Sequence, residues 1–406
     1  MYKVAITGIG IISCLGNDID TVGASLRLGK SGIVLDPKRV ELGFRSPLTG
    51  VIRGFNPQDY LSRKHLKTMP DFAVQAYAAS LQALRMAGLG QEEIQNDQTG
   101  LVFGCDSSTL AALEQVNLLK AHGETQSIGS GLIFRAMTST VTMNINCLLK
   151  TRGACWSISS ACSSGGHALG QAADLIRMGR QELVICGGAQ EINWESMCSF
   201  DALGAFSTRM DHPEAASRPF DRDRNGLVPG GGASAVVLER YDLAQKRGVP
   251  ILGELVSYGF SSDGSSLSIP TQDGIASAMK MALRTARLTA QDIDYVCAHA
   301  TSTPIGDAVE AAAIIEVFGE HRPYVSSLKS MTGHELWMSG ASQVVYSVIM
   351  ASKGFIAPNI NFENPDESSR KLNILKETLP LPPRRALCNS AGFGGTNASL
   401  VVRFDL

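Results

Sequence analysis

One cysteine of this sequence lies where its sulfur could act as a nucleophile. The stretch Ile158–His167 reads ISSACSSGGH, and Cys162 follows a segment expected to be extended (154–159) and precedes one with the apolar periodicity of a helix (163–178). The dipole and unpaired N–H groups at a helix N-terminus favour the thiolate form of a cysteine. Small neighbours leave room for an acyl group and a backbone N–H aimed at an oxyanion. A buried structural cysteine is the alternative interpretation.

Two histidines in the second part of the chain are possible partners for this cysteine. His299 follows the strand-like run Tyr295–Ala298, and His334 ends the stretch Lys329–His334, which follows another such run. One cysteine and two histidines at strand ends predict nucleophilic acyl chemistry. The remaining histidines are predicted to pack beside the cysteine on its helix (His167) or to lie on the surface (His65, His122, His212 and His321).

Other chemistries fit the sequence poorly. Gly8 and Gly10 follow a strand as in a dinucleotide-binding loop, but Ser13 takes the position of the third glycine and no acidic residue ends a second strand. The nine cysteines form no CxxC pair and no zinc-like spacing with histidine, so we expect no metal. We predict buried, reduced thiols and a cytoplasmic protein.

Charge and hydropathy exclude further classes. Lys and Arg number 36 against 38 Asp and Glu, a net charge of −2, which is not the balance of a nucleic-acid-binding protein. No apolar run approaches the ~18 residues of a membrane span, and the apolar start of the chain is too short for a secretory signal. We therefore expect no membrane insertion.

The segments that must position these side chains alternate between strands and helices. The first series comprises strands at Val4–Thr7, Thr99–Phe103 and Leu183–Cys186, with helices near Asp71–Ala87 and after Cys162. The second comprises strands at Ala233–Glu239, Ile251–Ser257, Tyr295–Ala298, Tyr324–Ser327 and Ala398–Phe404, with helices at Asp273–Thr285, Asp307–Phe318 and around Gly340–Ala351. No linker separates them, so we predict two similar, packed halves of α/β architecture.

Several motifs in a fixed order resemble one known family. They are Val4–Gly10, Ser157–Ser164, Ser217–Gly226, His299–Asp307, Lys329–His334 and Gly392–Asn397. Over nearly the whole chain they resemble the elongating β-ketoacyl-acyl carrier protein synthases, and Ser157–Cys162 is most similar to the type I branch of bacterial fatty acid synthesis. The resemblance implies a thiolase fold: an N-terminal half (1–250) with the cysteine and a C-terminal half (251–406) with the histidines, stacked as five layers. It also implies a homodimer, with a heterodimer with a related subunit as the alternative.

The same resemblance implies an activity, the decarboxylative Claisen condensation that lengthens an acyl chain by two carbons. Cys162 would hold the acyl chain as a thioester, and His299 and His334 would stabilise the enolate left when malonyl loses carbon dioxide. Backbone N–H groups of Cys162 and Phe393 would form the oxyanion hole. Substrates would arrive on the phosphopantetheine of acyl carrier protein, with no bound cofactor.

Further roles are carried over in the same way. Lys329 joins the catalytic set, with Glu310 and Asp307 in support, although Lys329 and Glu310 also fit a structural ion pair. The residues expected to bind substrate are Thr301, Thr303, Phe393, Ser107, Phe200 and Ala391, with Phe393 as a gate. The residues expected to dock the carrier protein are Arg63, Lys64 and Lys67.

Three positions depart from the family pattern. The chain has Glu335–Met338 where the family has Ser-Leu-Gly or similar, Ala391 where it has Phe, and Ala300 where it has Gly. We expect a displaced acyl cavity, and the alternative is that these residues pack at the dimer interface without touching substrate. A specialised polyketide or aryl polyene pathway is the alternative to fatty acid synthesis. An inactive chain-length factor is disfavoured because such subunits lack the cysteine. A starter enzyme using coenzyme A would have asparagine in place of one histidine. A thiolase would have a second catalytic cysteine in the C-terminal half, and Cys388, the only cysteine near that end, lies outside the Gly-rich loop.

Overall fold

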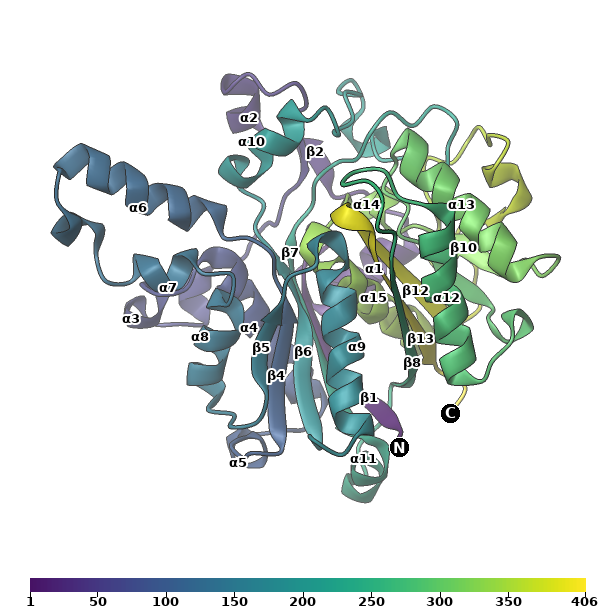
Figure 1. Cartoon of the computed structure of the whole chain (residues 1–406), viewed down its shortest axis with the longest axis horizontal. Helices are drawn as coiled ribbons and strands as arrows, with labels where there is room; N and C mark the ends of the chain where they lie inside the picture. The colour runs from purple at the N-terminus through teal and green to yellow at the C-terminus, as the bar shows by residue number, and fades with distance from the viewer.

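The computed structural model describes all 406 residues and contains one long mixed sheet, in the strand order β11-β10-β9-β12-β13-β8-β1-β7-β6-β4-β5 (Figure 1). The first half supplies β1 (Val4–Ile12), β4 (Thr99–Gly104), β5 (Cys155–Ile158), β6 (Leu183–Gln190) and β7 (Gly232–Arg240). The second supplies β8 (Gly253–Ser262), β9 (Tyr295–Cys297), β10 (Tyr324–Ser326), β11 (Asn373–Ile374), β12 (Arg385–Gly392) and β13 (Thr396–Arg403). A separate two-stranded sheet pairs β2 (Ile33–Leu35) with β3 (Leu48–Gly50).

The two halves repeat one pattern of strand directions. In the first half β5, β4 and β6 are parallel, and β7 and β1 follow as antiparallel neighbours. In the second half β10, β9 and β12 are parallel, and β13 and β8 follow in the same way. The halves join where β1 pairs with β8 over Ala5–Glu254 and Ile6–Gly253. The prediction of two similar α/β halves is confirmed.

Helices complete five layers around and between the half-sheets (Figure 1). On the outer face of the first half lie α4 (Asp71–Met86) and α8 (Thr140–Leu149). Between the halves lie α9 (Ser164–Arg177) and α15 (Ser339–Lys353), and outside the second lie α12 (Gln272–Ala286) and α13 (Pro304–Phe318). The largest hydrophobic core, of 39 residues, occupies the central layer. Strands covered on both faces read as unbroken apolar runs, and every residue of β1 is buried.

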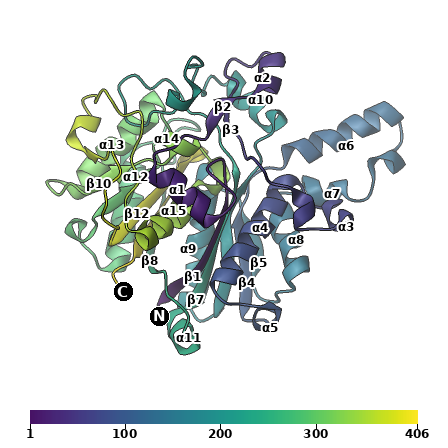
Figure 2. The ribbon, with the colours of Figure 1, turned by 180° about the vertical axis from the view of Figure 1, so that it is seen from behind.

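An arm extends from the first half. It contains α6 (Thr109–His122), which projects away from the body in both views, and α7 (Leu132–Ala136), which returns beside α8 (Figures 1 and 2). The remaining helices are α1 (Ile19–Arg27), α2 (Pro37–Glu41), α3 (Arg63–Leu66), α5 (Gln91–Ile94), α10 (Trp194–Ala202), α11 (Tyr241–Arg247) and α14 (Lys329–Thr332). None of the helices has the length and apolar character that crossing a bilayer requires.

Three expectations need correction. All nine cysteines are free, but Cys147, Cys155 and Cys198 are exposed, so burial does not hold for the whole set. His321 is half-buried, and its Nε2 atom lies 2.7 Å from the Ile293 carbonyl oxygen rather than in solvent. Strand β12 was missed because its sequence, RALCNSAG, lacks the β-branched residues that mark strands.

Candidate active site

The ends of four elements from both halves bring the candidate residues together. Cys162 lies in a short 3-10 turn (Ala161–Ser163) between β5 and α9. His299 follows β9, His334 follows α14 beyond the end of β10, and Phe393 follows β12. Because β9, β10 and β12 are parallel neighbours, their carboxyl ends open at one edge of the sheet.

One cavity of about 390 Å³ collects most of the predicted site residues. Its lining includes Cys162, His299 and His334. It also includes residues expected to support the site or contact substrate: Glu310, Thr301, Thr303, Phe200, Ala391 and Phe393. No group of three or more His, Cys, Asp or Glu side chains is arranged to hold a metal ion. The cavity therefore offers a nucleophile, two imidazoles and apolar walls.

The Cys162 thiol is not the preformed thiolate that its place before a helix predicts. Burial raises the pKa of Cys162 to about 12, although the charge of Lys329 and the backbone N–H groups of Phe393 and Cys162, which face the sulfur, lower it. Gly392 permits this approach, since a Cβ there would lie 3.0 Å from the Cys162 nitrogen. The resting sulfur is protonated because desolvation outweighs the favourable dipoles.

The two imidazoles meet edge to face, with ring centroids 5.1 Å apart and planes at 87°. Burial, and next the charge of Lys329, hold the pKa of each histidine well below its usual value, so both rings are neutral. Leu336 N–H donates to His334 Nδ1 at 3.3 Å, and Ser339 Oγ lies 3.2 Å from the same atom. The His334 proton is consequently on Nε2. His299 Nδ1 is buried without a hydrogen-bond partner.

Lys329 is a buried ammonium beneath this pair. It is 3% exposed, burial lowers its pKa, and its Nζ has no hydrogen-bond partner. Glu310 is close enough to affect its pKa, but the two side chains form no hydrogen bond. Lys329 therefore acts on the histidines and Cys162 through its electrostatic field rather than through a paired contact.

Glu310 and Asp307, both on α13, support the site through backbone hydrogen bonds. Glu310 accepts from the backbone N–H groups of His299 at 2.9 Å and Ala300 at 2.6 Å, and also from Asn389 Nδ2 at 3.1 Å. Asp307 accepts from the N–H groups of Phe220 and Ser302. Burial raises the pKa of Glu310, and raises that of Asp307 to about 7. Both carboxyls fix the loop that follows β9.

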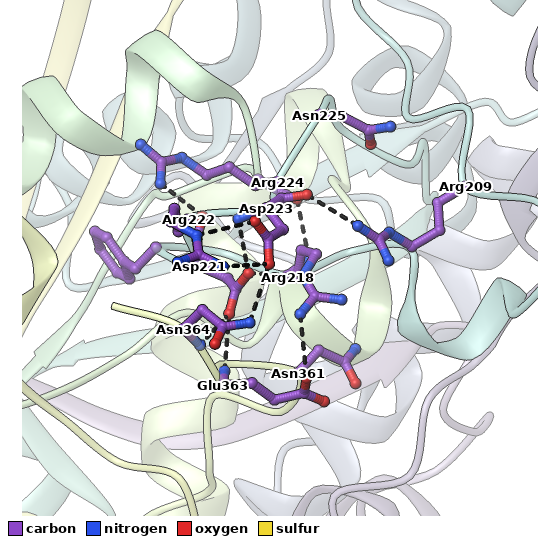
Figure 3. Close-up of polar contacts among 12 residues, drawn as sticks. Arg209, Arg218, Asp221, Arg222, Asp223, Arg224, Asn225, Asn361, Glu363 and Asn364 are labelled. Atoms are coloured by element: carbon purple, nitrogen blue, oxygen red, sulfur yellow. Dashed lines mark hydrogen bonds and ion pairs between the residues drawn. The ribbon is translucent and has the colours of Figure 1, made fainter. Parts of the chain in front are cut away.

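The motif Ser217–Gly226, to which the sequence assigned no role, makes polar contacts with Glu363 and Asn364 (Figure 3). The same motif clamps the loop that follows β9. Arg224 donates to the carbonyl oxygens of Thr303 at 3.0 Å and Pro304 at 2.8 Å, and pairs with Asp366 at 2.6 Å. Arg218 and Asp221 form a buried ion pair of 2.9 Å beneath it. The Thr301 and Thr303 hydroxyls, 3.3 Å apart, are thereby held at the cavity wall.

A second buried network supports the cysteine turn. His167 Nε2 lies 2.9 Å from Thr396 Oγ1, which in turn lies 2.9 Å from Ser160 Oγ. His167 Nδ1 lies 2.5 Å from Tyr258 Oη. Burial lowers the pKa of His167 to about 4, so the ring is neutral and packed, as the sequence predicted.

Some predicted residues lie outside the cavity. Ser107 is behind it, where its hydroxyl accepts from Trp337 Nε1 at 3.3 Å. Glu335, expected to reshape the acyl cavity, faces α15 instead and accepts from Tyr346 Oη at 2.6 Å and Ser342 Oγ at 2.5 Å. The basic residues Arg63, Lys64 and Lys67 are exposed at α3, which lies beside α7 and α8 away from the cavity (Figures 1 and 2).

Comparison with known protein families shows that two family models match successive parts of the chain. The β-ketoacyl synthase N-terminal domain matches residues 1–244 and the β-ketoacyl synthase C-terminal domain matches residues 252–363. The 3-oxoacyl-[acyl-carrier-protein] synthase 1 of Haemophilus influenzae is 41% identical, and that of Escherichia coli K12 is 40% identical, each over 99% of both chains. A crystal structure of a β-ketoacyl synthase from Burkholderia phymatum matches with a TM-score of 0.95 at 35% identity, covering 100% of each chain.

Proposed function

The chain belongs to the β-ketoacyl synthase family, and from that premise we propose that it condenses malonyl-acyl carrier protein with an acyl chain held on Cys162. The product is a β-ketoacyl-acyl carrier protein two carbons longer, made in fatty acid synthesis. One observation supports this assignment most: Cys162, His299 and His334 line a single cavity, with two backbone N–H groups at the sulfur.

The first half-reaction moves the acyl chain onto Cys162. The sulfur forms a bond to the acyl carbonyl carbon, the bond to the phosphopantetheine sulfur breaks, and the N–H groups of Cys162 and Phe393 hold the oxyanion. Because the resting thiol is protonated, its proton passes to a neutral imidazole and then to the leaving phosphopantetheine sulfur.

The second half-reaction breaks the carbon–carbon bond of malonyl to release carbon dioxide. The electron pair remains as an enolate, whose oxygen accepts hydrogen bonds from the neutral rings of His299 and His334. Burial, together with the charge of Lys329, keeps both rings uncharged, so they donate without protonating the carbanion. The carbanion then attacks the thioester carbonyl carbon, and the bond from that carbon to the Cys162 sulfur breaks. The released thiolate takes up a proton from solvent, because its original proton left on the phosphopantetheine sulfur.

The partner is acyl carrier protein, after which the two similar 3-oxoacyl-[acyl-carrier-protein] synthases are named. Thr301 and Thr303 contact the phosphopantetheine arm, and Phe393 gates its access to the sulfur. Arg63, Lys64 and Lys67 dock the acidic carrier.

No bound cofactor enters the reaction. We place the enzyme in the cytoplasm, in keeping with its free cysteines, and divide it into halves 1–250 and 251–406.

The working unit is a homodimer. Strand β5 is the sheet edge of the first half, and its Trp156 is 40% exposed. On the arm, Leu113, Val116, Ile133 and Phe134 are also exposed. An unpaired edge beside exposed apolar side chains is a surface that a second copy would cover.

Trapping the acyl-enzyme tests the function. The protein is incubated with acyl-acyl carrier protein or with acyl-coenzyme A, and peptide mass spectrometry locates the adduct. We expect the adduct on Cys162 from the carrier-bound donor, and carbon dioxide release with β-ketoacyl product when malonyl-acyl carrier protein is added. An adduct on another cysteine, or acylation from coenzyme A alone, would overturn the proposal.

A further inference from the structure

Apolar side chains surround Cys162, some in the wall of the cavity and some in the core behind that wall. Cys162 belongs to a buried cluster with Leu336, Trp337 and Met197, and Phe200 packs against it. An acyl chain on the sulfur must leave the cavity free for the second substrate, and it is stable only among apolar side chains. This cluster is therefore where the chain has to lie.

Trp337 has the largest side chain of this buried cluster. Its side chain is almost fully buried, and its ring lies 6.3 Å from the ring of Phe200 in a tilted contact. Phe200 in turn stacks on Phe393 at 5.9 Å, beside the cysteine. Trp337 is absent from the lining of the 390 Å³ cavity, whereas Phe200 and Leu336 line it. The indole thus lies behind Phe200 and Leu336, which form part of the cavity wall.

Polar contacts hold the indole in this position. Nε1 donates to Ser107 Oγ at 3.3 Å, and Ser107 Oγ donates to Glu191 Oε1 at 3.1 Å. Glu191 is buried and also accepts from the N–H of Thr109 at 2.6 Å, at the start of α6. An indole whose N–H is bonded to a satisfied network is costly to displace.

The backbone of Trp337 is held as firmly as its ring. Its N–H donates to Gln190 Oε1 at 3.3 Å, at the end of β6. Its carbonyl oxygen packs on α9, where a Cβ at Gly165 would lie 3.0 Å from it. The side chain therefore cannot withdraw by a shift of the main chain without disturbing the helix that follows Cys162.

From this arrangement we infer that Trp337 sets an upper limit on the length of the acyl chain that Cys162 accepts. Short chains fit between the sulfur and the indole. Long chains require the indole to leave its contacts with Ser107 and Phe200. The inference rests on the proposed function and adds its specificity: the preferred donors are short-chain acyl thioesters.

The test compares butyryl- and dodecanoyl-acyl carrier protein as donors to the wild type and to Trp337→Ala, Trp337→Phe and Ser107→Ala. The readout is kcat/KM for acylation of Cys162, with circular dichroism confirming the fold. Changes of a methylene or more in an apolar pocket alter selectivity by about 10- to 200-fold. We expect Trp337→Ala to raise the dodecanoyl-to-butyryl ratio by at least about tenfold. Trp337→Phe and Ser107→Ala should raise it less, because a ring still fills the space.

The outcomes separate the two proposals. If the butyryl donor acylates Cys162 but Trp337→Ala has the same dodecanoyl-to-butyryl ratio of kcat/KM as the wild type, the inference about Trp337 is wrong and the proposed function stands. A higher kcat/KM of the wild type for the dodecanoyl donor than for the butyryl donor would also contradict the inference about Trp337. Failure of the folded wild type to be acylated by either donor contradicts the proposed function itself. If Trp337→Ala does not fold, the ratios for Trp337→Phe and Ser107→Ala decide, and no rise in either overturns the inference.

Discussion

The rings of His299 and His334 stand edge to face, with 5.1 Å between their centroids, although the two residues are 35 positions apart in the chain and lie in different turns. Both are neutral because burial and Lys329 lower their pKa. Two neutral donors at one point suit a developing enolate oxygen, since they stabilise charge without supplying a proton to carbon.

Replacing either histidine by alanine should slow decarboxylation more than acyl transfer. We expect His299→Ala and His334→Ala to lower the rate of carbon dioxide release by about 10²–10³-fold, as loss of one oxyanion donor does. Acylation of Cys162, measured by intact mass, should fall less. Equal losses in both half-reactions, with the fold preserved, would contradict this division of roles.

The raised pKa of Cys162 predicts how its reactivity depends on pH. Because burial raises it to about 12, alkylation of Cys162 by iodoacetamide should accelerate about tenfold per pH unit up to at least about pH 9. The modification must be followed on the peptide containing Cys162, since Cys147, Cys155 and Cys198 are exposed and serve as internal references. A plateau below about pH 8 would indicate a preformed thiolate instead.

Cys162→Ser should lose condensation by orders of magnitude, because an unactivated hydroxyl is a poor nucleophile.

Glu335 predicts a pH-dependent stability. Burial raises its pKa from 4.5 to about 7, so the folded state binds more protons than the unfolded state between these values. Stability contributed by the protonated form is therefore lost as pH rises from about 4.5 to about 7. The wild type should lose on the order of 2–3 kcal/mol of unfolding free energy from about pH 5 to about pH 8 through this group, and Glu335→Gln should not. The stability of the variant relative to the wild type should therefore rise by that amount over this pH range.

Urea titrations at the two pH values measure this difference. Glu41→Gln is the matched control, because Glu41 is exposed and its substitution should leave the pH dependence unchanged. A pH-independent difference between Glu335→Gln and wild type would mean that Glu335 is ionised in the folded protein throughout this range.

Charge reversal at Arg63 and Lys67 should weaken carrier docking. Rim charges act mainly on association, so we expect KM for carrier-bound substrate to rise by about tenfold at low salt and the effect to shrink as salt is added. Lys246→Glu on α11, an exposed charge on a different helix, is the control. An acyl-pantetheine substrate without carrier should be unaffected. If it responds equally, the substitutions disturb the site rather than the docking surface.

The sequence alone determined the elements with strong local patterns and indicated residues that the structure brings together at one cavity. The apolar run of β1 and the helical period after Cys162 follow from contacts between near neighbours in the chain. The types of residue at Cys162, His299 and His334, each in a turn after a strand, were enough to predict acyl chemistry. Strand β12 was missed because its burial comes from its neighbours β9 and β13, and its own sequence lacks the β-branched residues typical of strands.

The tertiary structure decided what depends on distance through space and on the exclusion of water. The helix start favours a thiolate at Cys162, yet desolvation by the surrounding core keeps the thiol protonated. Glu335 turns to Tyr346, and Trp337 reaches Ser107, 230 positions away in the chain. No local pattern encodes such partners, because hydrogen bonds and pKa values respond to groups that only folding brings within a few ångströms.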